Sequence, residues 1–140
     1  MHLPYVAHVM KQQLEQASSS GGGEFTVVPL MIGHLSKKSC AAYAQALLPY
    51  FQDPDNLFII SSDFCHWGSR FRYQPYDASK GDIHQYIEWL DKEAIALIES
   101  QSHDGFMQYL DQTDNTICGR EAIKLLLVLI GMSSKEYTTK

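Results

Sequence analysis

The predicted fold class depends on one stretch, residues 53–68, which reads DPDNLFIISSDFCHWG. Its first four residues are turn formers, and the part from Ser61 onward is polar and aromatic. Between them, residues 57–60 form a short continuous apolar run, which is typical of a β-strand buried on both faces. Such a strand needs neighbours on both edges, so this stretch predicts a sheet in the core of the protein.

Helical periodicity and capping residues predict helices before and after this strand in the sequence. These helices are expected at Tyr5 to Ala17, Ser36 to about Tyr50, Ile83 to Ile98, Phe106 to Leu110 and Glu121 to Ile130. A second strand is expected at Phe25 to Ile32, which is rich in β-branched and aromatic residues. Helices alternating with strands indicate an α/β fold with a mainly parallel sheet. Because only two strands are visible, we expect the sheet to be incomplete, with further strands upstream, downstream or in a partner.

The composition and charge indicate a globular protein and argue against nucleic-acid binding and membrane insertion. Of the 140 residues, 45% are hydrophobic and 19% charged, which is typical of a single globular domain. The formal net charge of −5 argues against nucleic-acid binding, since that needs a large basic surface. The longest apolar run, Leu125 to Ile130, is far shorter than the roughly 18 residues that span a bilayer, so no membrane insertion is expected. Three cysteines without a CxxC pair indicate no disulfide framework, and we expect a cytoplasmic or nuclear protein.

The first candidate site directly follows the predicted buried strand. Asp63 and His66 are three residues apart there, at the end of a strand, where α/β sheets bind ligands. A carboxylate and an imidazole can act as acid and base, or bind a metal such as iron or zinc. The alternative is that Asp63 caps the loop and His66 makes a structural hydrogen bond.

The second candidate is Cys118, within Asn115 to Arg120, where a helix is expected to begin. Backbone N–H groups at a helix start and the nearby Arg120 favour the thiolate, which can attack an electrophile or bind a metal. The alternative is a small buried hydrophobic side chain, which is the usual environment of a free cysteine.

Two longer segments carry a resemblance to a known family. SSDFCHWGSRFRY at residues 61–73 and DNTICGR at residues 114–120 resemble the Memo family, the mediators of ErbB-driven cell motility. Four further segments match in order: MHLPY, EFTVVPLMIG, DPDNLFIISSDF and IEWLDK. The resemblance implies a LigB-like fold, in which a mainly parallel or mixed sheet has helices on both faces in three layers. That fold is similar to class III extradiol non-haem iron dioxygenases.

The resemblance also implies a pocket. Asp63, His66 and Cys118 match three of its residues, whereas two upstream histidines of the family match nothing here. Cys118 is then the one retained metal ligand of three. We therefore expect iron or copper binding to be weak or absent, and we expect residues 1–140 to form one Memo-like domain truncated at both ends.

Three functions remain open from the sequence. The resemblance implies a Memo-like protein of receptor-tyrosine-kinase-linked cell motility and cytoskeletal signalling, whose pocket binds a metal or a phosphotyrosine receptor peptide. An alternative is a non-haem iron dioxygenase-like or copper-dependent redox enzyme. A second alternative is a thiol hydrolase, with Cys118 as nucleophile, His66 as base and Asp63 orienting the imidazole. A carboxylate behind the imidazole would favour the hydrolase, and three ligands converging on one centre would favour a metal.

Overall fold

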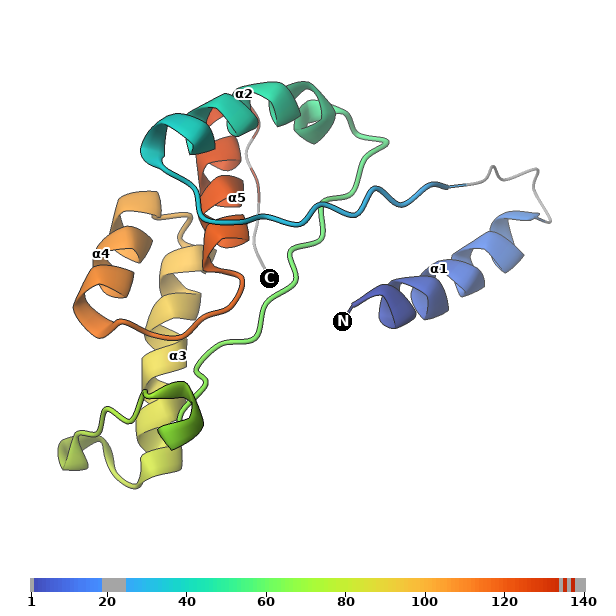
Figure 1. Ribbon diagram of the computed structural model, residues 1–140. Helices are drawn as coiled ribbons and strands as arrows, with labels where there is room; N and C mark the ends of the chain where they lie inside the picture. Colours follow the sequence, from blue (N-terminus) through green and yellow to red (C-terminus); the bar gives the residue numbers. More distant parts are fainter. Residues whose placement is uncertain (1, 19–24, 134, 136, 138–140) are drawn as a thin grey trace. The chain divides into compact units, whose positions relative to one another are not determined.

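The computed structural model describes residues 2–18, 25–133, 135 and 137, with only the backbone of residues 12–18. The chain divides into two compact units, residues 1–31 and 32–140. The first unit contains α1, Leu3–Ser18. The second contains α2, Lys37–Gln52, α3, Ile83–Glu99, α4, His103–Thr113, and α5, Arg120–Met132, with short 3-10 helices at Ser69–Phe71 and Ala78–Lys80 (Figure 1). The expectation of a single domain over residues 1–140 stays a prediction.

Local signals in the sequence begin these helices. The Ser36 hydroxyl accepts a hydrogen bond from the Ser39 N–H at 3.1 Å before α2, and Ser102 caps α4 in the same way. Asp82 and Gln85 form a capping box at the start of α3. All five predicted helices are confirmed, with ends that differ from the predicted ones by a few residues. Within the described part of the chain, none of them has the length and hydropathy that a membrane span requires.

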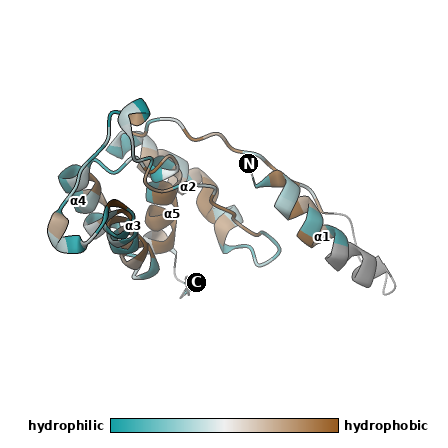
Figure 2. Ribbon diagram, turned by 90° about the horizontal axis from the view of Figure 1, so that it is seen from below, coloured by the Kyte–Doolittle hydropathy of each residue, from teal (hydrophilic) through white to brown (hydrophobic). Residues whose placement is uncertain are grey.

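Helix α5 lies at the centre of the second unit because two of its sides are apolar. Ile123 and Leu127 belong to a buried cluster with α3 and α4, whereas Leu125 and Leu129 belong to another with α2. A step of two residues turns an α-helix by about 200°, so the two pairs face opposite sides. Hydropathy colouring shows α5 as predominantly hydrophobic, as expected for a helix packed on both sides (Figure 2).

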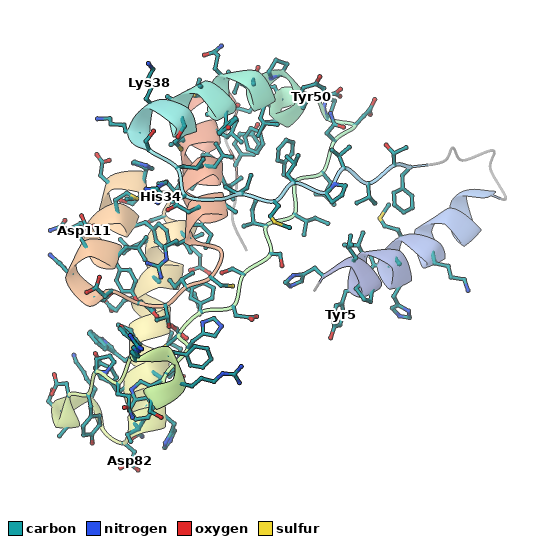
Figure 3. All side chains as sticks on the ribbon, viewed as in Figure 1. Tyr5, His34, Lys38, Tyr50, Asp82 and Asp111 are labelled. Carbon is teal, nitrogen blue, oxygen red and sulfur yellow. The ribbon has the colours of Figure 1, made fainter. Side chains whose placement is uncertain are left out.

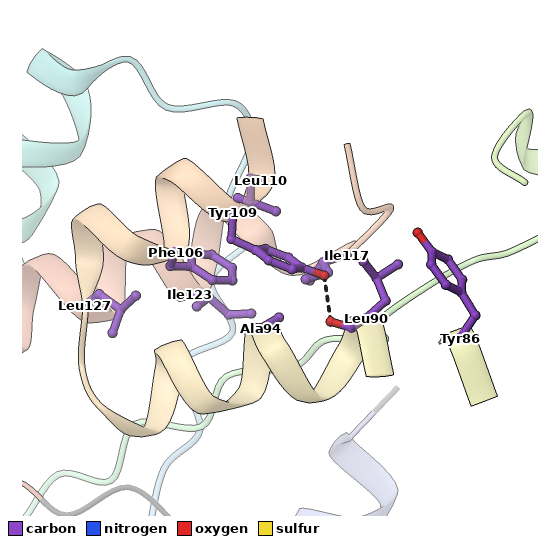
Figure 4. Packing of buried hydrophobic residues seen from close by; sticks show 9 residues of the cluster. All are labelled: Tyr86, Leu90, Ala94, Phe106, Tyr109, Leu110, Ile117, Ile123 and Leu127. Carbon is purple, nitrogen blue, oxygen red and sulfur yellow. Dashed lines mark hydrogen bonds between the residues drawn. The ribbon is translucent and has the colours of Figure 1, made fainter. Parts of the chain in front are cut away.

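The cluster of α3, α4 and α5 is the main core. Its members are Tyr86, Leu90, Ala94, Phe106, Tyr109, Leu110, Ile117, Ile123 and Leu127 (Figure 4). Phe106 and Leu90 are fully buried, and burial of such a side chain contributes about 1.5–3 kcal/mol. The Tyr109 hydroxyl donates to the Leu90 carbonyl oxygen at 2.9 Å, so this buried polar group has its partner (Figure 4).

Glu121 attaches the extended segment before α2 to the first turn of α5. Its carboxylate accepts a hydrogen bond from the Leu35 N–H at 3.1 Å, lies 3.2 Å from His34 Nδ1 and pairs with Lys124 (Figure 3 labels His34). The Lys124 ammonium also donates to the Leu35 carbonyl oxygen at 2.9 Å. Burial alone would raise the pKa of Glu121, but these hydrogen bonds and the Lys124 charge outweigh burial and hold that pKa below its usual value. The ionised carboxylate therefore stabilises the attachment.

The predicted α/β class, with a three-layer LigB-like arrangement around a sheet, is wrong for the residues that the structure describes. They form helices and extended segments, with an isolated bridge between Gly68 and Tyr73 and no sheet. The predicted strands at Phe25 to Ile32 and Leu57 to Ile60 are extended, but neither forms a strand. A strand requires a backbone ladder as well as suitable side chains. No backbone hydrogen bond joins Leu57 to Ile60 with another described segment.

The side chains of this second segment alternate, as those of a strand do. Phe58 and Ile60 pack against the two buried clusters, while Leu57 is 78% and Ile59 is 51% exposed. The prediction that this segment is buried on both faces is therefore also wrong. The segment nevertheless leads the chain to the loop before α5, so that the residues after Ile60 lie near that loop (Figure 1).

Candidate functional site

Two segments, residues 61–66 and 115–119, meet beside the first turn of α5. The Cys118 N–H donates to the Asp63 carbonyl oxygen at 3.2 Å, and the Gly119 N–H donates to the Ser62 hydroxyl oxygen at 3.0 Å. That hydroxyl in turn donates to the Asp63 carbonyl oxygen at 2.8 Å. These hydrogen bonds fix the two segments against each other, although about 50 residues separate them in sequence.

Gly119 lets the two segments approach closely. A Cβ atom on Gly119 would lie 2.4 Å from Ser62 Cβ and 2.8 Å from the Ser61 carbonyl oxygen, far inside van der Waals contact. The φ angle of Gly119 is −86°, which every residue type adopts. Glycine is therefore needed here for space rather than for backbone conformation.

Thr116 determines how His66 is oriented. The His66 N–H donates to the Thr116 hydroxyl oxygen at 2.6 Å, and His66 Nδ1 lies 2.8 Å from the Thr116 carbonyl oxygen. On its other side, the imidazole ring packs against the Phe71 ring, with centroids 5.1 Å apart. The remaining ring nitrogen, Nε2, lies 3.8 Å from Asp63 Oδ2.

The structure brings the three predicted site residues together. One ligand atom each from Asp63, His66 and Cys118 lies within 4.8 Å of the other two. The Asp63 N–H donates to Cys118 Sγ at 3.1 Å, so the backbone also connects two of them. Cys118 is exposed, which excludes the alternative of a small buried hydrophobic side chain. Arg120, expected to favour the thiolate, donates through Nε to the Ile117 carbonyl oxygen at 3.1 Å.

A partly buried polar network joins the two segments of the site to α3. The Asp91 carboxylate accepts from the Cys65 N–H at 3.1 Å and from Asn115 Nδ2 at 3.1 Å. Burial raises the pKa of Asp91, and these two hydrogen bonds oppose the rise. Burial, together with the nearby Asp91, raises the pKa of Cys65 to about 11, so Cys65 is a neutral thiol at neutral pH. The network therefore holds both segments without supplying a second reactive thiol.

The three donor atoms lie close to the spacing that a metal site requires. Bonds of about 2.0–2.3 Å in a tetrahedral arrangement place donor atoms roughly 3.3–3.8 Å apart. Asp63 Oδ2 and His66 Nε2 are already 3.8 Å apart, and the whole set lies within 4.8 Å. Side-chain rotations that move a donor by about 1 Å would complete the arrangement.

Sequence reasoning missed the residues that hold the site together. Thr116, Ser62 and Asp91 act through hydrogen bonds whose partners are distant in sequence. Thr116 and Ser62 stand inside the two conspicuous segments, and that proximity was the only sequence signal for them. Asp91 lies on α3, and nothing in its local sequence indicates a contact with Cys65.

The sequence matches the family of Memo-like proteins over residues 1–139. Protein MEMO1 from Homo sapiens is 44% identical over 127 residues, which are 91% of this chain and 40% of that protein. Protein MEMO1 from Danio rerio is 46% identical over the same shares. The memo-1 homolog of Caenorhabditis elegans is 41% identical over 128 residues, 91% of this chain and 34% of that protein.

This chain thus spans about 40% of the length of the vertebrate relatives that it matches. The resemblance of SSDFCHWGSRFRY and DNTICGR to Memo proteins is confirmed by a family match that runs through both segments and almost to the end of the chain. The two segments that converge on Asp63, His66 and Cys118 are therefore segments of a family member: this chain belongs to the Memo family.

Proposed function

We propose that this Memo-family chain binds iron or copper weakly through Asp63, His66 and Cys118. One observation carries the proposal: three different donor groups, from segments 55 residues apart, converge within 4.8 Å of one another. Structural hydrogen bonds account for the positions of the backbone there and for the Cys118 sulfur, which accepts from the Asp63 N–H, but they do not account for the Asp63 carboxylate oxygen 3.8 Å from His66 Nε2.

The donor set suits transition metals. Imidazole binds iron, copper and zinc, thiolate is a soft ligand, and a carboxylate is a hard one. Three protein ligands leave a position open for water or another ligand. The Asp63 side chain is 52% exposed, so solvent competes with it, and we expect dissociation constants in the micromolar range or weaker.

The geometry favours a metal site over a thiol hydrolase. A hydrolase needs its carboxylate on the imidazole nitrogen that faces away from the nucleophile. In this chain the Thr116 carbonyl oxygen takes the Nδ1 side, and Asp63 instead faces Nε2. Asp63 therefore does not orient the imidazole ring in the way that a Cys-His-Asp hydrolase requires.

Calorimetric titration with anaerobic iron(II), and chelator competition for copper(I), test the proposal. Cys118→Ala and His66→Gln should each weaken binding by about tenfold or more, because each removes a donor of the set. His84→Gln is the matched control, since His84 is an exposed residue on α3, outside the site. Stoichiometric, sub-micromolar iron binding that survives Cys118→Ala would refute the assignment.

The family also supports a role in receptor-tyrosine-kinase-linked motility signalling, through recognition of a phosphotyrosine peptide. The relatives are more than twice as long as this chain, so we propose this role for the whole protein. Fluorescence anisotropy with one labelled receptor peptide, phosphorylated and unphosphorylated, tests it. Tighter binding of the phosphorylated form is expected, and equal binding of both forms would contradict the proposal.

A further inference from the structure

The Thr116 contact determines which nitrogen of His66 carries the proton. A carbonyl oxygen has lone pairs and no hydrogen, so it can only accept a hydrogen bond. His66 Nδ1 lies 2.8 Å from the Thr116 carbonyl oxygen, so Nδ1 must be the N–H donor. In the neutral ring Nε2 then carries the free lone pair. That is the nitrogen 3.8 Å from Asp63 Oδ2.

Thr116 is itself held firmly on both sides. Its neighbours Asn115 and Ile117 are both fully buried. Asn115 Nδ2 donates to Asp91 Oδ1 at 3.1 Å and to the Tyr109 hydroxyl oxygen at 2.7 Å, and Ile117 packs in the main core. The backbone of Thr116 thus has little freedom to move with the imidazole ring.

We propose that Thr116 is a positioning residue that holds His66 in the Nδ1–H tautomer, with the Nε2 lone pair turned toward Asp63 and Cys118. Its carbonyl oxygen selects the tautomer, and its hydroxyl oxygen fixes the backbone of His66 by accepting the N–H at 2.6 Å. The consequence for metal affinity rests on the proposed function, whereas the tautomer does not. Partners that orient a ligating histidine typically change metal affinity by 10–100-fold when they are removed.

Nitrogen-15 NMR of the metal-free full chain tests the tautomer directly. In the neutral ring, we expect His66 Nδ1 to show the shift of a protonated nitrogen and Nε2 that of an unprotonated one. This measurement needs no variant, so it is independent of any folding defect. A wild-type His66 with the proton on Nε2 would overturn the proposal.

Variants test the hydroxyl. Thr116→Val keeps the carbonyl oxygen that selects the tautomer but leaves the His66 N–H without an acceptor, so His66 should stay protonated on Nδ1 while its backbone shifts and metal affinity drops about tenfold. Thr116→Ser keeps the hydroxyl and should restore the affinity. Thr113→Val is the matched control, because its hydroxyl bonds to the Tyr109 carbonyl oxygen and the Asn115 N–H in the same connection without touching His66. Equal effects of Thr113→Val and Thr116→Val would overturn the specific role of Thr116.

The same samples separate the two proposals. If His66 carries its proton on Nδ1 but the wild-type chain binds no metal, the positioning role stands and the proposed function fails. If metal binds with its affinity lowered by His66→Gln but unchanged in Thr116→Val, the proposed function stands and the positioning role fails.

Discussion

Substituting Gly119 by alanine tests whether close packing of two segments creates the site. The new Cβ would lie 2.4 Å from Ser62 Cβ and 2.8 Å from the Ser61 carbonyl oxygen. Carbon atoms in contact are normally about 3.5–4.0 Å apart, so the segments must separate by roughly 1 Å. The contact to Ser61 is with backbone, so a change of side-chain rotamer cannot relieve it.

The expected cost follows from that displacement. Overpacking of a tightly packed position costs typically about 1–3 kcal/mol of unfolding free energy. The same displacement strains the Gly119 and Cys118 backbone hydrogen bonds to Ser62 and Asp63, which are 3.0 and 3.2 Å long. The donor atoms, now within 4.8 Å of one another, would move apart, so we expect metal affinity to fall by at least tenfold.

Chemical denaturation and calorimetric metal titration measure the two effects on one sample. Gly131→Ala is the control, because Gly131 lies in α5, which Gly119 directly precedes, and nothing lies within 4 Å of its added Cβ. That control should stabilise the fold by up to about 1 kcal/mol, as alanine does in place of glycine within a helix. A Gly119→Ala chain with wild-type stability and wild-type metal affinity would refute the reasoning.

Three further predictions concern the fold. Because the folded-state pKa of Glu121 is lowered, its contribution to stability is present above about pH 4.5 and is lost as the pH falls through that lowered pKa. Glu121→Gln should therefore cost about 1–2 kcal/mol at pH 7 and progressively less in acid-range denaturation curves, and a cost that is independent of pH would contradict the role of the ionised carboxylate. Phe106→Ala removes a fully buried ring and should cost about 3–5 kcal/mol of unfolding free energy, whereas a loss below 1 kcal/mol would show that the core is packed differently. Ile59 is 51% exposed, so Ile59→Lys should change stability by less than about 0.5 kcal/mol and raise solubility, and a large loss of stability would mean that this side chain is buried.

The helices could be predicted from the sequence because their signals are local. The helix starts are specified by contacts between residues at most four positions apart, as at Ser36 before α2 and at the Asp82 and Gln85 pair of α3. Apolar residues at helical spacing specify the buried side of each helix. The absence of strands could not be predicted in this way. Leu57 to Ile60 has the side chains of a strand, but a strand also needs a neighbouring segment that pairs with its backbone by hydrogen bonds. The described chain supplies none for this segment, so its backbone stays extended without a ladder.

Part of the candidate site could also be predicted from the sequence. Their chemistry and the family resemblance point to Asp63, His66 and Cys118, and the structure places these residues together. Their convergence was expected at the end of a sheet strand, which the described residues lack. It arises instead from the hydrogen bonds of Ser62 and Thr116 across about 50 residues of sequence, which no local pattern encodes.

X-ray absorption spectroscopy of the chain loaded with iron(II) or copper(I) is the most direct test that these two segments form a metal site. We expect one sulfur neighbour at about 2.3 Å together with nitrogen or oxygen neighbours at about 2.0–2.2 Å. The sulfur contribution should disappear in Cys118→Ser and persist in Cys40→Ser, since Cys40 is buried in the cluster with α2. A first shell with only nitrogen and oxygen in the wild-type chain, or a sulfur neighbour that remains in Cys118→Ser, would contradict the account.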